Sequence, residues 1–86
     1  MAEEKLGHVI HYWSKIGVAG IHLTDGELNV GDTIRVKGHT SDFTVTVDSM
    51  QIDGDAVEIA KVGDDIGLKV PEYTREHDEV WKVVAD

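Results

Sequence analysis

The chain has 86 residues, of which 17 are acidic and eight are basic, so its formal net charge at neutral pH is −9. Its length provides for one small core and no second domain, and the absence of cysteine excludes disulfides and thiolate metal sites. The negative charge disfavours broad, sequence-independent binding to a phosphate backbone but leaves room for a local basic patch. Because the sequence shows neither a signal-peptide pattern nor an apolar stretch of membrane-spanning length, we expect a cytoplasmic protein without a membrane partner.

Apolar and polar residues alternate in several short runs, which is the pattern typical of half-buried strands. We expect these runs to form six strands, near Leu6–Trp13, Gly17–Thr24, Thr33–Lys37, Asp42–Ile52, Asp65–Val70 and Glu79–Val84. Glycine, aspartate and the single proline fall between them, and Ala56–Lys61 is expected to form a short helical turn. The pattern predicts an all-β fold, a single small six-stranded, antiparallel-rich β-barrel over residues 1–86 in which residues 1–5 form a disordered N-terminus.

The motif V-G-D-x-I occurs twice, at residues 30–34 and 62–66. In each copy the glycine permits a tight turn, the aspartate can bond to nearby backbone, and an apolar strand follows at once. The similarity between the copies ends after about eight residues, so we interpret it as one turn design used twice and not as a duplicated unit.

The segment "SKIGVAGIHLTDGELNVGDTIRVKG", Ser14–Gly38, resembles the β-barrel second domain of translational GTPases of the elongation factor Tu type. Downstream, "TVTVDSMQID", "AKVGDDIGLKV" and "HDEVWKV" are similar to the later strands of that domain, so the resemblance covers Leu6–Val84. It implies a translation-elongation-factor-like module that docks on transfer or ribosomal RNA, or on another protein. Similar barrels occur as domains appended to U32-type peptidases. The sequence contains no G-x-x-x-x-G-K-S/T phosphate loop, so we expect no nucleotide binding and no GTPase activity.

Aromatic and basic side chains are interleaved in "HVIHYWSK", His8–Lys15, and such a pattern can stack on bases and neutralise phosphate. On a regular strand, His8, Ile10 and Tyr12 would share one face, with Val9, His11 and Trp13 on the other. Further bases share an outward face of a later strand. The candidate binding surface comprises Tyr12, Trp13, Lys15, Arg35, Lys37 and His39. The alternative is that one aromatic fills the core and that the bases are ordinary solvent-facing charges.

Metal binding and catalysis find little support in the sequence. His8 and His11 would point to opposite faces of a strand and could not share one ion, so we expect no metal site and no cofactor. Neither a G-x-S-x-G elbow nor an H-E-x-x-H motif is present, and a small barrel offers little concave volume once its core is filled. We therefore expect a protein that is not an enzyme.

Two functional hypotheses follow from the sequence. The first is a monomeric, non-catalytic elongation-factor-like binding module that docks on RNA or a ribonucleoprotein, such as transfer or ribosomal RNA in a translation complex. The second is a protein–protein adaptor that docks on a larger enzyme such as a U32-type peptidase, through its acidic face or a free strand edge.

Overall fold

The computed structural model describes residues 2–84, which contain ten strands and no helix. In chain order the strands are β1 (Ala2–Trp13), β2 (Val18–Leu23), β3 (Leu28–Asn29), β4 (Thr33–Lys37), β5 (Asp42–Thr46), β6 (Met50–Ile52), β7 (Asp55–Val57), β8 (Ile59–Ala60), β9 (Asp65–Lys69) and β10 (Glu79–Val84). All of the strand pairings are antiparallel. The expected all-β, antiparallel class is thus confirmed, whereas the count of six strands is wrong.

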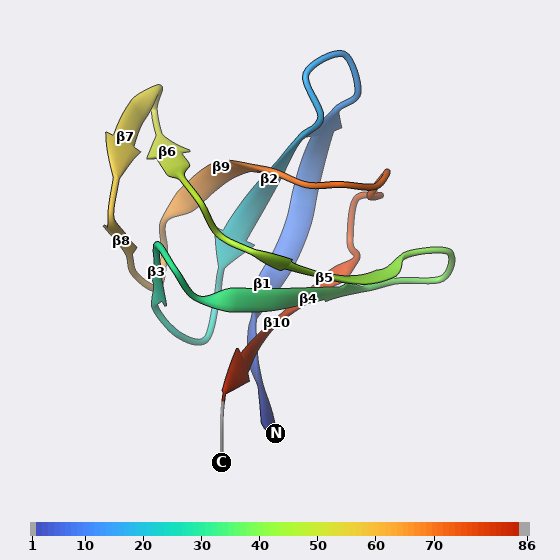
Figure 1. Cartoon of the computed structure of the whole chain (residues 1–86), viewed down its shortest axis with the longest axis horizontal. Coiled ribbons are helices and arrows are strands. Elements are labelled where there is room, and N and C mark those ends of the chain that lie inside the picture. The colour runs from blue at the N-terminus through green and yellow to red at the C-terminus, as the bar shows by residue number, and fades with distance from the viewer. Residues whose placement is uncertain (1, 85–86) are drawn as a thin grey trace.

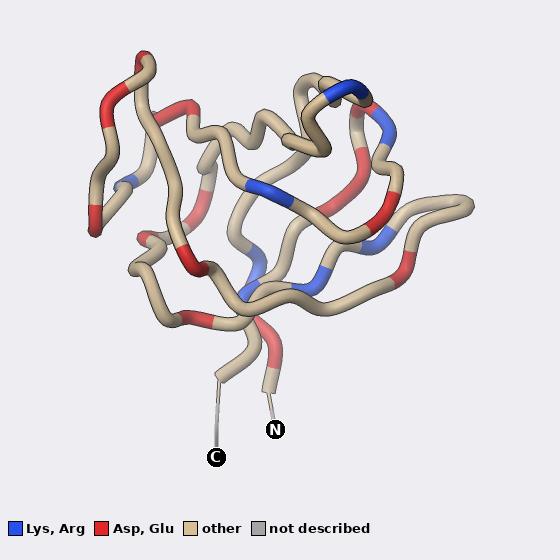
Figure 2. Tube along the Cα trace, turned by 45° about the horizontal axis from the view of Figure 1, so that its top comes forward, with Lys and Arg blue, Asp and Glu red and all other residues tan. Residues whose placement is uncertain are grey.

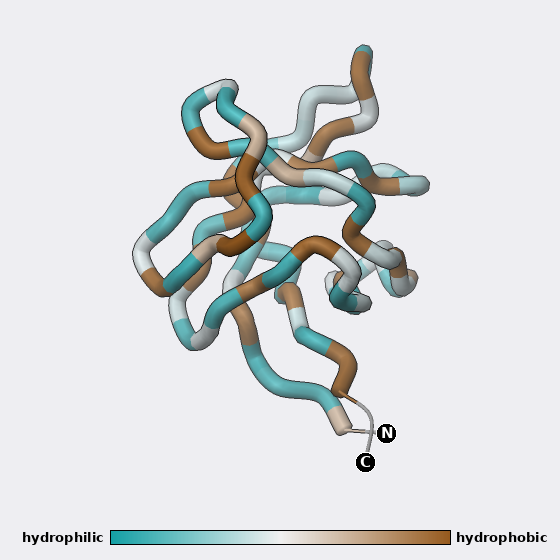
Figure 3. Tube along the Cα trace, turned by 60° about the vertical axis from the view of Figure 1, so that its left-hand side comes forward, coloured by the Kyte–Doolittle hydropathy of each residue, from teal (hydrophilic) through white to brown (hydrophobic). Residues whose placement is uncertain are grey.

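Eight strands form one sheet in the order β5-β4-β10-β1-β2-β9-β6-β7, and β3 pairs separately with β8. The large sheet curls around a single core, so that strands from both ends of the chain lie side by side (Figure 1). Hydrophobic and hydrophilic residues alternate along several strands, which gives each an inner and an outer face (Figure 3). The fully buried core side chains include Leu6, Val9, Ile21, Leu23, Leu28, Ile34, Val36 and Val80.

The sheet is not closed by a strand ladder in the described residues. The expected strand Asp42–Ile52 is divided into β5 and β6, because the chain bends at Asp48 and leaves one edge of the sheet for the other side. The Val47 backbone N–H donates to the Asp32 carbonyl at 2.8 Å, and its carbonyl accepts from Gly31 N–H at 2.8 Å. β5 is therefore one edge strand and β7 the other, and the predicted closed barrel is replaced by a curled open sheet.

Two further local predictions differ from the structure. The helical turn expected at Ala56–Lys61 is wrong, because β7 and β8 occupy this segment. Asp53 and Gly54 both have positive φ, 52° and 83°, and join β6 to β7 as the two-residue hairpin turn that an Asp-Gly pair favours. Residues 1–5 were expected to be disordered; residues 2–5 lie in β1 and pair with β10, and Met1 lies outside the described residues.

The two V-G-D-x-I motifs form the same turn, as predicted. Gly31 and Gly63 adopt φ values of 98° and 95°, a region that side chains with a Cβ resist. The following aspartates then accept hydrogen bonds three residues back, Asp32 from Asn29 N–H at 2.9 Å and Asp64 from Lys61 N–H at 2.8 Å. This shared chemistry supports a repeated turn design.

Strand β1 contains an irregularity between Val9 and His11 that changes which side chains share a face. Val9 pairs with Ile21 and His11 with Gly20, so Ile10 is the extra residue of a β-bulge. Val9 is consequently buried, whereas Ile10 remains 40% exposed. The alternation expected for a regular strand fails here, since the bulge shifts every later side chain by one position.

Candidate functional site

The two cations expected to form a basic surface on β4 are paired with carboxylates of the same chain. Arg35 donates through Nε and Nη2 to both carboxylate oxygens of Asp42, at 2.8 and 2.9 Å, and through Nη1 to Glu3 at 3.0 Å. Lys37 Nζ lies 2.7 Å from the other oxygen of Glu3. Hydrogen bonds from Lys37 and then Arg35 lower the pKa of Glu3, and the hydrogen bonds from Arg35 lower the pKa of Asp42. These cations are therefore already paired, and a phosphate would have to displace the carboxylates.

Trp81 of β10 completes this network on the outer face of the sheet. Lys5 and Lys37 place their ammonium groups 5.5 and 5.1 Å from its ring centroid, within the range of cation–π attraction. The hydrogen bond from Lys5 and then that from the Trp81 indole lower the pKa of Glu79. The sequence analysis did not select Trp81, because nothing local to it indicates that two lysines from other strands lie over its ring.

The structure does not bring the six predicted surface residues together. Tyr12 is half-buried against the core, with its ring 4.9 Å from that of Tyr73 in an edge-to-face arrangement. Trp13 is on the outer face and is 45% exposed, and Lys15 is exposed in the turn after β1. Arg35 and Lys37 belong to the paired network on β4, and His39 is exposed in the turn between β4 and β5. The structure thus gathers Tyr12, Trp13 and Lys15 around one hollow at the β1–β2 turn, and Lys37 and His39 around another. The predicted residues do not form one continuous surface.

Trp13 instead contributes to a hollow on the outer face of β1, β2, β6 and β9, which we call the Trp13 groove. Its volume is about 400 Å³. The lining residues are Ile10, Trp13, Ile16, Val18, Gln51, Asp53, Gly54, Asp65, Ile66 and Gly67. Ile10 and Trp13 are three positions apart and would lie on opposite faces of a regular strand. The bulge inserts one extra residue between the paired positions, so both side chains lie on the outer face.

Two glycines on neighbouring strands shape the groove in different ways. Gly20 of β2 pairs directly with Gly67 of β9. A Cβ at Gly20 would lie 3.1 Å from Cζ3 of Trp13, so the missing side chain lets the indole ring lie down on β2. A Cβ at Gly67 would meet only Cγ1 of Val18 at 3.5 Å, an ordinary contact, and would project into the hollow. Gly67 therefore leaves the floor of the groove open, and Gly20 lets Trp13 approach the sheet beside it.

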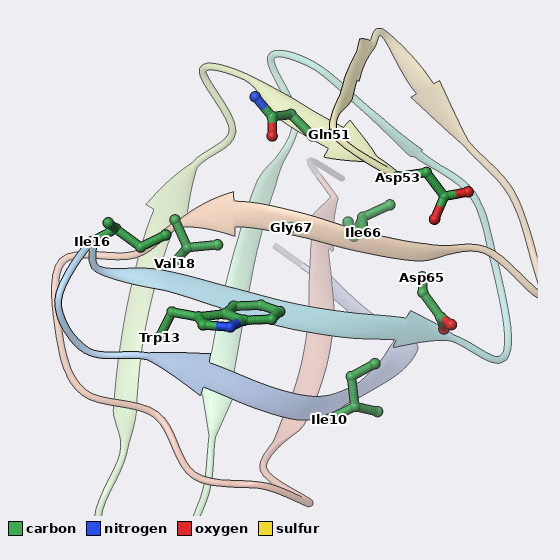
Figure 4. A pocket seen from close by; sticks show the side chains of 10 residues that line it. Ile10, Trp13, Ile16, Val18, Gln51, Asp53, Asp65, Ile66 and Gly67 are labelled. Atoms are coloured by element: carbon green, nitrogen blue, oxygen red, sulfur yellow. The ribbon is translucent and has the colours of Figure 1, made fainter.

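The groove has an apolar end and an acidic end. Figure 4 shows Ile16 and Val18 at one end, and the carboxylates of Asp53 and Asp65 at the other, with the Trp13 ring between them. Asp65 lies 2.5 Å from His22 Nδ1, whereas Asp53 forms no ion pair with any cation of residues 2–84. The acidic side of the hollow continues into the β6–β7 hairpin, where acidic residues are concentrated (Figure 2).

Sequence reasoning missed most of this groove, although one signal was present. Gly20 and Gly67 each interrupt an apolar strand, and a glycine inside a strand often marks the close approach of another group. The pairing that places the two glycines side by side depends on the sheet order, which alternation within one strand does not reveal.

Within residues 2–84, no group of three or more histidines and carboxylates is arranged to hold a metal ion. Over the same part of the chain, no helix has the length and apolar character needed to cross a bilayer. The groove itself presents apolar side chains and two carboxylates, an arrangement suited to recognition by contact.

These features define a class: a small antiparallel all-β module with an apolar hollow on its outer face. The structure aligns with the C-terminal domain of a putative U32 peptidase of Geobacillus thermoleovorans, with a TM-score of 0.87 over 94% of this chain and 93% of that domain, at 19% identity. The selenomethionine variant of that domain aligns with a TM-score of 0.84. The fold is therefore that of a U32 peptidase C-terminal domain.

Sequence comparison also identifies proteolytic enzymes as relatives. The chain is 40% identical over 78 residues to an uncharacterized protease of Methanocaldococcus jannaschii, a match that covers 90% of this chain and 19% of the protease. It is 32% identical over 78 residues to a collagenase of Porphyromonas gingivalis, covering 22% of that protein. The chain thus spans about a fifth of the length of the curated relatives it matches. No protein-family model matches it.

The predicted kinship with translation elongation factors is wrong, because the structure matches a U32 peptidase C-terminal domain and the sequence matches a protease and a collagenase. The residues that carried the resemblance were mainly the V-G-D-x-I turns and the strands after them. Those turns are built from a positive-φ glycine and a backbone-bonded aspartate, which report local chain geometry that unrelated small β folds can share.

Proposed function

We propose that this chain is a non-catalytic binding module that docks on a larger polypeptide, in the manner of a domain appended to a U32-type peptidase. The supporting observation is that similarity extends over 90% of this chain but over only 19% of the M. jannaschii protease. A region of that size accounts for a domain of the protease and leaves most of its length for the catalytic machinery. The Trp13 groove offers a concave, partly apolar surface of the kind used for contact with another chain.

The cation pairing on β4 supports a protein partner over a nucleic acid. Arg35 and Lys37 are held by Glu3 and Asp42, and the net charge of the chain is −9. A phosphate backbone would meet a repulsive field and would compete with bidentate carboxylate contacts. A polypeptide with apolar and basic side chains would encounter neither cost.

The proposal is tested with the M. jannaschii protease from which the matched 78 residues have been removed. Nuclease-treated truncated protease is passed over the immobilised chain, and binding is measured by biolayer interferometry. We expect saturable binding, and no hydrolysis of a gelatin substrate by the isolated chain. Absence of binding would contradict the docking role. Hydrolysis that rises in proportion to the concentration of the isolated chain would contradict the non-catalytic role.

A further inference from the structure

The Trp13 groove lies between a segment of the chain without acidic residues and a segment rich in them. One wall comes from the β1–β2 hairpin, since the segment from Leu6 to Leu23 contains no acidic residue. The other wall comes from β9 and the β6–β7 turn, which supply Asp53 and Asp65. Large apolar side chains remain exposed on the first wall, with Trp13 at 45% and Ile16 at 61%. An apolar surface beside two carboxylates, of which Asp53 has no ion pair within residues 2–84, favours a partner with both an apolar and a cationic side chain.

We infer that the Trp13 groove binds a segment of a partner polypeptide in which an apolar side chain lies next to a lysine or arginine. This inference names the chemistry of the partner and rests on the proposed docking function. The apolar side chain packs between Trp13, Ile16 and Val18, and the cationic group reaches the acidic end formed by Asp53 and Asp65 (Figure 4).

The acidic end selects a cation. Asp53 has no ion pair with the cations of residues 2–84, and Asp65 has only the His22 ring as a neighbour of opposite potential charge. A cation held between the two carboxylates would be attracted by both, and the acidic β6–β7 hairpin adds to the field (Figure 2). The same charges repel a phosphate or a carboxylate.

The floor of the groove favours a polypeptide segment. Gly67 lines the hollow and is partly exposed, so an extended chain can approach the sheet there more closely than it could over a side chain, whereas its neighbour Gly20 is buried beneath Trp13. The six-membered end of the Trp13 ring covers Gly20, where an added Cβ would lie 3.1 Å from Cζ3 and 3.3 Å from Cη2, and the ring borders the hollow (Figure 4). An aromatic face of this kind accepts either an aliphatic stem or an arginine plane.

The inference is tested by NMR titration of the isotope-labelled chain with three octapeptides of fixed design. The first is acetyl-Gly-Ser-Arg-Trp-Leu-Arg-Gly-Ser-amide, the second carries Glu in place of both Arg residues, and the third carries Ala in place of Trp and Leu. We expect the first peptide alone to shift the Trp13 indole and the Gly20 and Gly67 amide signals at submillimolar concentration. The shifts should weaken as salt is raised, because the cation remains solvent-accessible.

Variants of the acidic end separate groove binding from general attraction to an acidic protein. Asp53→Asn combined with Asp65→Asn should weaken binding of the first peptide about 3- to 10-fold, the range expected for losing two exposed ion pairs. Asp48→Asn changes an exposed aspartate that does not line the groove and should leave binding within about twofold. Equal weakening by both changes would overturn the inference, as would shifts of equal size with the glutamate peptide or no groove shifts up to millimolar peptide.

A variant with a filled groove tests whether the truncated protease binds at this site. Gly67→Leu fills the hollow from its floor, and Thr44→Leu adds the same side chain at an exposed position on β5. Loss of protease binding in the first variant alone would support the inference. If both variants bind the protease as the wild type does, docking stands and the groove assignment fails. If the wild type does not bind the protease, docking fails, and the peptide titration still decides what the groove accepts.

Discussion

The same substitution, Gly→Ala, should have opposite effects at two glycines of this sheet. Neither Gly7 nor Gly67 has a positive φ, so backbone strain does not distinguish the two sites. They differ in the space available for a side chain. At Gly67 the new methyl would meet only Val18 Cγ1 at 3.5 Å. At Gly7 it would lie 2.0 Å from the carbonyl oxygen of His22 and 2.9 Å from the carbonyl carbon, both in the backbone of the paired strand β2.

The magnitudes follow from these distances. Gly67→Ala should raise the free energy of unfolding by about 0.5–1 kcal/mol, because alanine loses less conformational entropy in a strand. In a domain of this size, that gain corresponds to an increase in Tm of about 2–8 °C. Gly7→Ala requires β1 and β2 to separate by about 1 Å before the contact reaches 3.0 Å, which disturbs their ladder and should cost at least about 2 kcal/mol.

The assay is guanidinium unfolding followed by tryptophan fluorescence and by far-ultraviolet circular dichroism. Wild type, Gly67→Ala and Gly7→Ala are compared at constant slope m, so that differences in midpoint report stability. Gly67→Ala serves as the matched control because it makes the same chemical change in a strand of the same sheet. A Gly7→Ala protein as stable as the wild type would refute the close approach of β1 to β2 at this residue.

Three further predictions concern the charge network, a turn and the core. Because Arg35 lowers the pKa values of Asp42 and Glu3, its stabilising effect is complete above the unfolded carboxyl values near 4 and is lost as the pH falls through the lowered values. Unfolding midpoints of wild type and Arg35→Gln should therefore converge as the pH falls below about 4 and through the lowered pKa values, and a pH-independent gap would contradict the network. Asp64→Ala removes the acceptor at 2.8 Å in the second V-G-D turn and should cost about 0.5–1.5 kcal/mol in urea unfolding; an unchanged midpoint would contradict that role. Ile21→Ala empties a site with 0% exposure and should cost about 2–5 kcal/mol by the same assay, whereas a cost below 1 kcal/mol would show that the site collapses or is not core.

Local sequence patterns predicted the function of this chain only in part. The alternative that named an adaptor on a U32-type peptidase agrees with the comparisons, whereas the elongation-factor assignment does not. Both rested on the same turn-and-strand segments, and such segments specify chain geometry more directly than ancestry.

The sequence by itself determined the strand faces and the repeated turn. Ile34 and Val36 are buried and alternate with polar neighbours, because a strand places successive side chains on opposite faces. Ile66 and Leu68 are buried for the same reason. The V-G-D turns also followed from sequence, since a positive φ at glycine and an aspartate bonding to backbone three residues away are short-range effects.

Only the tertiary structure decided which residues are neighbours across strands. Arg35 reaches Glu3 across 32 positions of sequence, and Gly20 meets Gly67 through the pairing of β2 with β9. The bulge at Ile10 likewise appears only when β1 is paired with β2. Local preferences fix the conformation of a few adjacent residues, whereas strand order depends on how the whole chain buries its apolar faces. The cation pairing and the Trp13 groove, both products of strand order, were therefore beyond what the sequence alone could specify.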